Sequence, residues 1–125
     1  MQKVLKLKIA SSTSCLSFLR ELLDKLEMPE RMRQKCVLAL VEAVDNAIFH
    51  AHKNDESIPI DIKVSYGEKK AVLEVKDKGE GFDIDEVPVP SLDQINGRGI
   101  FIVKKLMKKV EYKNNTLRMT YEERN

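Results

Sequence analysis

The chain has 125 residues, of which 42% are hydrophobic and 34% are charged, and its formal net charge is +2. This composition is typical of a globular protein, and we expect residues 1–125 to form one domain. So small a net charge gives no argument for a direct nucleic-acid partner. No apolar run approaches the ~20 residues of a membrane span, and the N-terminus lacks the apolar stretch of a signal peptide. Its two cysteines fit buried free thiols, so we expect a cytoplasmic protein without a membrane partner.

The first half of the chain predicts one strand and two helices. Polar and apolar side chains alternate over residues 3–9, which favours an opening strand. Serines and a threonine at 11–13 precede leucines at helical spacing and predict a helix that ends near Met28. Pro29 suits the first turn of a second helix, which we expect over residues 30–52.

The second half predicts two hairpins and a helix. Residues 58–77 alternate on either side of a short turn and indicate a hairpin. Residues 78–96 show no periodicity, and a loop of this length is usually functional. A helix resumes at Gly99 or Ile100, and a last hairpin turns at residues 114–115. The order β-α-α-β-β-α-β-β implies an α+β two-layer sandwich, a mostly antiparallel sheet with helices on one face.

Three clusters of polar residues and glycines carry a chemical signal, and the first lies in the second helix. Glu42 and Asn46 sit about 40° apart on a face roughly opposite the apolar stripe. A carboxamide oxygen suits Mg²⁺, and a carboxylate one turn away can deprotonate a hydroxyl. A solvated helix face would explain both residues if they are considered alone, although Phe49 on the same side fits a pocket or a partner surface.

The second cluster follows the strand that ends at Asp77. Gly79 and Gly81 let the backbone turn there and come close to a flat ligand. A buried carboxylate at this position can accept a hydrogen bond from an exocyclic amine such as N6 of adenine. An ordinary Asp-x-Gly turn would explain the same residues if they are considered alone.

The third cluster, Gly97-Arg98-Gly99, opens a helix. Free N–H groups at a helix N-terminus and the missing Cβ of glycine make an anion site. Thr116 heads the last strand and could donate its hydroxyl to a phosphate, although an ordinary strand threonine is the simpler explanation. The spacing fits neither a P-loop nor a dinucleotide fingerprint. Together and in this order, the three clusters indicate a pocket for ATP with a divalent cation.

The joint pattern resembles the GHKL ATPase superfamily and, within it, the anti-sigma factor serine/threonine kinases of bacteria, the group that contains SpoIIAB and RsbW. Residues 42–51 resemble the N box, 77–82 the G1 box and 97–99 the G2 box. The resemblance covers nearly the whole chain and implies the Bergerat ATP-binding fold. It also implies a kinase that uses ATP and Mg²⁺, binds a sigma factor and phosphorylates a serine or threonine of an anti-anti-sigma (STAS-domain) protein. Such kinases commonly act as homodimers.

The resemblance implies a role for each matching residue. Glu42 would be the general base, and Asn46 would be the Mg²⁺ ligand. Asp77 would bind adenine, while Gly79 and Gly81 would shape that turn. Gly97 and Gly99 would border the nucleotide phosphates, and Arg98 between them would also bind the nucleotide. Residues 83–96 would form the ATP lid, and Thr116 would contact a phosphate.

The chain departs from the family at one place. Some members carry an arginine shortly before the G2 glycines, whereas residues 94–96 here are Gln-Ile-Asn and the nearby arginine is Arg98. This departure leaves the identity of a lid arginine open, and it leaves open a switch kinase resembling RsbT, whose partner is not a sigma factor. A nucleotide-dependent regulatory binding module with little turnover would also fit the pattern, as would a stand-alone ATPase.

Overall fold

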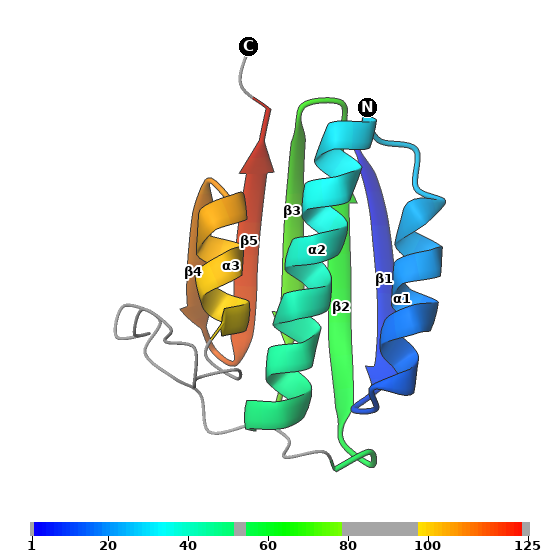
Figure 1. Cartoon of the computed structure of the whole chain (residues 1–125), viewed down its shortest axis with the longest axis vertical. Coiled ribbons are helices and arrows are strands. Elements are labelled where there is room, and N and C mark those ends of the chain that lie inside the picture. Colours follow the sequence, from blue (N-terminus) through cyan, green and yellow to red (C-terminus); the bar gives the residue numbers. More distant parts are fainter. Residues whose placement is uncertain (1, 52–54, 79–97, 124–125) are drawn as a thin grey trace.

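The structure, a computed structural model, describes residues 2–51, 55–78 and 98–123, which form an α+β sandwich (Figure 1). The elements in chain order are β1 (Lys3–Ala10), α1 (Ser14–Asp24), α2 (Glu30–Asn46), the π-helical segment η1 (Ala47–Ala51), β2 (Pro59–Tyr66), β3 (Lys70–Lys76), α3 (Arg98–Leu106), β4 (Lys109–Lys113) and β5 (Thr116–Glu122). The predicted order of strands and helices and the predicted fold class are confirmed.

The five strands form one antiparallel sheet in the order β1-β2-β3-β5-β4. Both predicted hairpins are present, and the second one turns through Asn114 and Asn115, whose φ angles are 52° and 60°. Asparagine tolerates this left-handed region better than most residues, and two such residues in succession are typical of a tight hairpin turn. Because Lys76 pairs with Thr116, this turn lies beside the end of β3.

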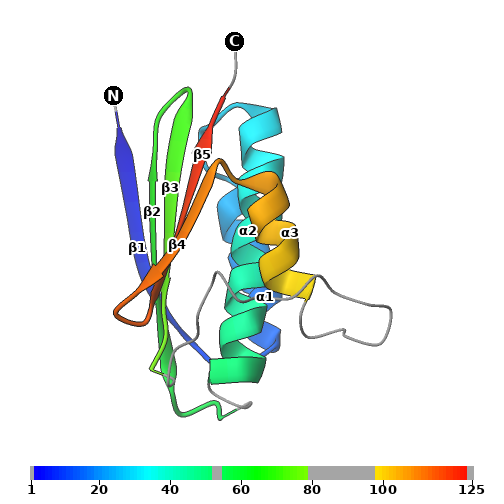
Figure 2. The same ribbon diagram turned by 90° about the vertical axis from the view of Figure 1, so that its left-hand side faces the viewer.

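All three helices cover one face of the sheet, and Figure 2 shows the opposite face without a helix. Side chains alternate between the two faces along each strand, so Ala71, Leu73 and Val75 of β3 are buried beneath the helices. α2 is the central helix and contacts α1, α3, β3 and β5. Among the described residues, no helix is both long enough and apolar enough to cross a membrane.

The end of the second helix differs from its prediction over residues 30–52. α2 is α-helical only to Asn46 and then continues as the π-helical segment η1, whereas His52 lies outside the described residues. A π turn takes one more residue per hydrogen-bonded ring than an α turn, so it rotates the side chains that follow. In η1 Ile48 is fully buried and Phe49 is 37% exposed. The apolar pattern predicts only that a helix continues, and it carries no signal for the wider turn.

Candidate active site

Chemically active groups from distant parts of the sequence gather at one end of the sandwich (Figure 1). The C-terminal half of α2, the residue that follows β3, the β4–β5 turn and the N-terminus of α3 all lie at this end. The backbone N–H of Asp77 donates a hydrogen bond to the carbonyl oxygen of Asn115 at 2.9 Å, which ties the end of β3 to the turn. Two contacts therefore bring the sequence clusters together. The pairing of β3 with β5 places Asp77 of the second cluster beside the β4–β5 turn. The packing of α2 against α3 places Glu42 and Asn46 of the first cluster at the same end as the start of α3, which the third cluster opens.

Glu42 is half-buried on the face of α2 that does not enter the core. Burial raises the pKa of its carboxyl above the ordinary 4.5, the nearby charge of Asp45 raises it further, and the charge of Arg20 on α1 lowers it. A carboxylate with a raised pKa is a better proton acceptor near neutral pH. The role of Glu42 as a general base stays a prediction, with which this raised pKa agrees. The three-residue spacing of Glu42 and Asp45 on one helix indicates the influence of Asp45, whereas no local sequence pattern indicates that of Arg20.

Asn46 is the last residue of α2, one turn after Glu42, and its side chain is half-buried. The π-helical segment follows it directly, and such segments occur frequently at functional sites. An amide oxygen is a suitable ligand for Mg²⁺, which usually takes one or two protein oxygens and completes its shell with phosphates and water. Among the described residues there is no group of three or more His, Cys, Asp or Glu side chains that could hold a metal ion.

Asp77 continues the helix-facing alternation of β3, and only 6% of its surface is exposed. The side-chain amide of Asn115 donates a hydrogen bond to its Oδ1 at 3.1 Å. The hydroxyl of Tyr112 donates to Oδ1 and Oδ2 at 3.4 and 3.3 Å. Burial, the charge of Asp77 and this hydrogen bond raise the pKa of Tyr112 to about 12, so the phenol stays protonated and donates. Asp77 is thus a buried hydrogen-bond acceptor held in a fixed orientation, as an amine-binding carboxylate requires.

Tyr112 and Asn115 are site residues that the sequence patterns do not identify. The sequence predicts Asn115 only as a turn residue and Tyr112 only as part of a strand. The alternation along β4 turns Tyr112 toward the helices with Val110, and this is the signal that could have identified it. Its distance from Asp77 depends on the pairing of β3, β5 and β4, which a local pattern does not give.

The side chain of Thr116 does not lie beside the carboxylate of Asp77. It begins β5, where Leu117 faces the helices, so the side chain of Thr116 belongs to the opposite face of the sheet. There it lines a shallow hollow with Lys76, and its hydroxyl donates to the carbonyl oxygen of Asn114 at 3.3 Å. Its contact with a phosphate stays a prediction.

The third cluster is described only in part. α3 begins at Arg98, one residue before the predicted start, and Gly99 lies in its first turn. The first N–H groups of a helix have no partner within the helix and carry partial positive charge, which suits an anion. The predicted site residues that lie outside the described residues are Gly79, Gly81, Gly97 and those of the lid, 83–96.

Comparison with known proteins gives an independent view of this site. A protein-family model described as a histidine kinase-like ATPase domain matches residues 6–121. Serine-protein kinase RsbW of Bacillus subtilis (strain 168) is 29% identical in an alignment 89 residues long, which covers 63% of this chain and 56% of that relative. RsbW of Oceanobacillus iheyensis is 31% identical in an alignment 88 residues long, which covers 62% of this chain and 55% of the relative. The chain therefore spans about half the length of the curated relatives it matches.

Proposed function

Because the chain belongs to the family of histidine kinase-like ATPase domains, we propose that it is an ATP- and Mg²⁺-dependent protein serine/threonine kinase and an anti-sigma factor. Its phosphoacceptor is a serine or threonine of an anti-anti-sigma (STAS-domain) protein, and its regulatory partner is a sigma factor. The similarity to proteins named serine-protein kinase supports this class of activity. The single observation that carries the proposal is the position of the half-buried Glu42 one turn before Asn46, on the face of α2 that does not enter the core.

Glu42 is the group that would distinguish a kinase from a passive ATP-binding domain. Bound ATP supplies the phosphoryl group. The acceptor hydroxyl oxygen forms a new bond to the γ-phosphorus while the bond to the leaving ADP oxygen breaks, and Glu42 accepts the hydroxyl proton. The amide oxygen of Asn46 would hold Mg²⁺, which would offset the negative charge of the phosphates during transfer. Burial of Glu42 suits this role, because a carboxylate with an ordinary pKa is a weaker base.

Asp77 and its two hydrogen-bond donors would recognise the base of the nucleotide. Asp77 accepts a hydrogen bond from the adenine amino group, and Asn115 and Tyr112 keep its carboxylate in place. A carboxylate cannot donate to the carbonyl oxygen that guanine presents at the same position, so this residue selects adenine. The N-terminus of α3 faces the phosphates, with Gly97, Arg98 and Gly99 of the third cluster around it.

A second candidate is a binding module that holds a regulator in a nucleotide-dependent way with little turnover. The observation that favours it is the exposure of large apolar side chains on the helices: Phe18 is 57% exposed, Leu38 40% and Phe49 37%. Exposed apolar side chains of this size can contact a protein partner. A switch kinase would differ from both candidates, because it phosphorylates its acceptor but does not bind a sigma factor.

Phosphotransfer from γ-labelled ATP to candidate STAS-domain proteins from the same genome tests the proposal. We expect Glu42→Gln to lower the transfer rate at least ~100-fold, the usual contribution of a general base, while ATP affinity is kept. Glu21→Gln is the matched control, because Glu21 is an exposed acid on α1. It should transfer phosphate at the unmodified rate.

Each other outcome selects a different function. ATP binding without transfer to any acceptor would favour the binding module, and transfer without affinity for a sigma factor would favour the switch kinase. Phosphate release without an acceptor would favour a stand-alone ATPase.

The same samples serve for light scattering, where the proposed homodimer requires twice the 14.4 kDa mass of the chain. A mass equal to one chain at all concentrations would exclude the homodimer.

A further inference from the structure

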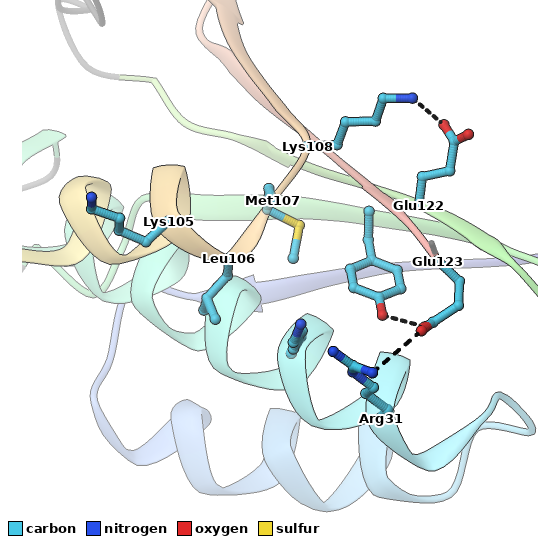
Figure 3. A pocket seen from close by; sticks show the side chains of 9 residues that line it. Arg31, Lys105, Leu106, Met107, Lys108, Glu122 and Glu123 are labelled. Carbon is cyan, nitrogen blue, oxygen red and sulfur yellow. Dashed lines mark hydrogen bonds and ion pairs between the residues drawn. The ribbon is translucent and has the colours of Figure 1, made fainter. Parts of the chain in front are cut away.

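A cavity lies at the opposite end of the sandwich from Glu42 and Asp77. Figure 3 shows the residues that line it, and we call it the far-end cavity. Its volume is about 600 Å³, within the range of pockets that hold small ligands or a few peptide residues. Arg31 and Lys35 at the N-terminal end of α2 line it together with residues at the end of α3, the start of β4 and the end of β5. Lys35 and Glu42 are seven residues apart, or about 10 Å along α2, so this cavity is separate from the candidate active site.

Two of the four cations that line the far-end cavity are already paired. Lys108 contacts Glu122 at 2.9 Å, and Arg31 contacts Glu123 at 3.9 Å. The hydroxyl of Tyr121 also donates a hydrogen bond to Glu123 (Figure 3). The cation of each pair is largely exposed to solvent, and an exposed cation can exchange its partner for a competing anion.

The other two cations have no carboxylate partner among the described residues. The ammonium of Lys35 lies over the ring of Tyr121, 5.8 Å from its centroid, and that of Lys105 lies over the ring of Phe101 at 5.4 Å. Four cations and two carboxylates leave the cavity with a net charge of +2. Arg31 and Lys35 also sit near the N-terminal end of α2, where the helix dipole disfavours cations. This positive charge therefore has no evident role in stabilising the helix.

The cavity also has an apolar component. Met107 and Tyr121 are 6% and 5% exposed, and Leu106 is half-buried. The exposed part of Leu106 and the edges of Met107 and Tyr121 give the cavity a small apolar surface. A ligand that matches the cavity therefore carries two negative charges and an apolar side chain.

We propose that the far-end cavity binds an acidic peptide segment of a partner protein. Two carboxylates of the segment meet Lys35 and Lys105, and an apolar side chain between them contacts Met107 and Tyr121. A nucleic acid fits less well, because Glu122 and Glu123 would repel a continuous row of phosphates. Flexible lysines act as point charges that suit carboxylates in varied positions, whereas Arg31, the arginine of the cavity, already contacts Glu123. The proposal depends on neither ATP nor phosphotransfer.

Titration of the ¹⁵N-labelled chain with a capped seven-residue peptide tests this proposal. The peptide carries two acidic residues on each side of a central leucine, and its control carries Asn and Gln in their place. We expect the acidic peptide to shift the amide signals of residues 31, 35, 105–108 and 121–123, with an affinity that falls as salt is added. The double variant Lys35→Glu/Lys105→Glu should weaken binding at least ~10-fold, whereas Lys6→Glu/Lys25→Glu, at exposed lysines outside the cavity, should not.

Three results would overturn the proposal. The first is equal shifts with the acidic and the neutral peptide. The second is unchanged affinity in the Lys35→Glu/Lys105→Glu variant, with Lys35→Gln/Lys105→Gln as the replacement if the first variant does not fold. The third is tighter binding of inorganic phosphate or of a single-stranded oligonucleotide at the same residues, which would assign the cavity to phosphates.

Discussion

At the scale of single residues, three neighbouring influences set the proton affinity of Glu42. Burial and Asp45 raise its pKa, and Arg20 lowers it. A general base must be ionised, so the transfer rate should fall as the pH drops through this pKa, and that fall should begin above the range of an ordinary glutamate. Arg20→Gln removes the stabilising charge and should move the acid limb of the kcat/KM profile to higher pH. Asp45→Asn removes the repelling charge and should move it to lower pH.

The two variants serve as controls for one another in these pH profiles. A purely structural disturbance would lower the rate at every pH and leave the position of the acid limb unchanged. Shifts of the same sign in both variants would show that Glu42 is not the titrating base. The measurement therefore separates the electrostatic argument from a general loss of activity.

The residues of the candidate site differ in how far a sequence can predict them. Glu42 and Asn46 share a helix face because they are four residues apart, and this follows from helical geometry alone. The buried position of Asp77 follows from the alternation of one strand. Asn115 contacts Asp77 across 38 residues of sequence, and Tyr112 across 35. Such contacts depend on strand pairing and register, which local patterns leave undetermined.

At the scale of elements, the β4–β5 turn needs residues that adopt positive φ angles, and it also supplies a hydrogen-bond donor to Asp77. Asn114 and Asn115 both have positive φ, which glycine adopts without strain, but only Asn115 donates its side-chain amide to Asp77. Asn115→Gly should therefore keep the turn and lose the hydrogen bond. A hydrogen bond to a charged group contributes roughly 1.5–3 kcal/mol, so we expect ATP affinity to fall at least ~10-fold by calorimetry.

Asn114→Gly is the matched control for Asn115→Gly. It makes the same backbone change one residue earlier and keeps the amide that contacts Asp77, so ATP affinity should stay within about twofold of the unmodified chain. Equal losses in both variants would mean that the turn conformation matters and the amide does not. Unchanged ATP affinity in both variants would mean that the hydrogen bond to Asp77 plays no part in nucleotide binding.

The elements themselves are predicted well wherever one physical pattern dominates. The alternation of the hairpins and the paired asparagines of the last turn predict β2–β3 and β4–β5. The pattern fails at the end of α2, where apolar spacing at Ala47 and Ile48 continues but the hydrogen bonding changes from α to π. An α turn and a π turn bury nearly the same residues over so short a segment, so hydrophobicity cannot distinguish them.

At the scale of the whole molecule, one hydrophobic core connects the two ends of the sandwich. α1, α2, α3 and four of the five strands contribute buried side chains, and β4 adds the half-buried Val110 and Tyr112. A single core predicts a single cooperative unfolding transition, in line with the one-domain prediction. Leu40 is fully buried at the centre of α2, so Leu40→Ala should lower the free energy of unfolding by about 2–5 kcal/mol in one urea transition.

The same unfolding experiment can separate the two proposed binding sites. A ligand that binds only the folded chain stabilises it by about 2.7 kcal/mol at 100 times its dissociation constant. ATP with Mg²⁺ should therefore raise the urea midpoint of the unmodified chain and, by the same amount, that of Lys35→Glu/Lys105→Glu, because these lysines lie at the far end of α2. The acidic peptide should raise only the midpoint of the unmodified chain. If the lysine variant also lost the stabilisation by ATP, the two ends would be coupled through α2, and the far-end cavity would be a regulatory site for the nucleotide.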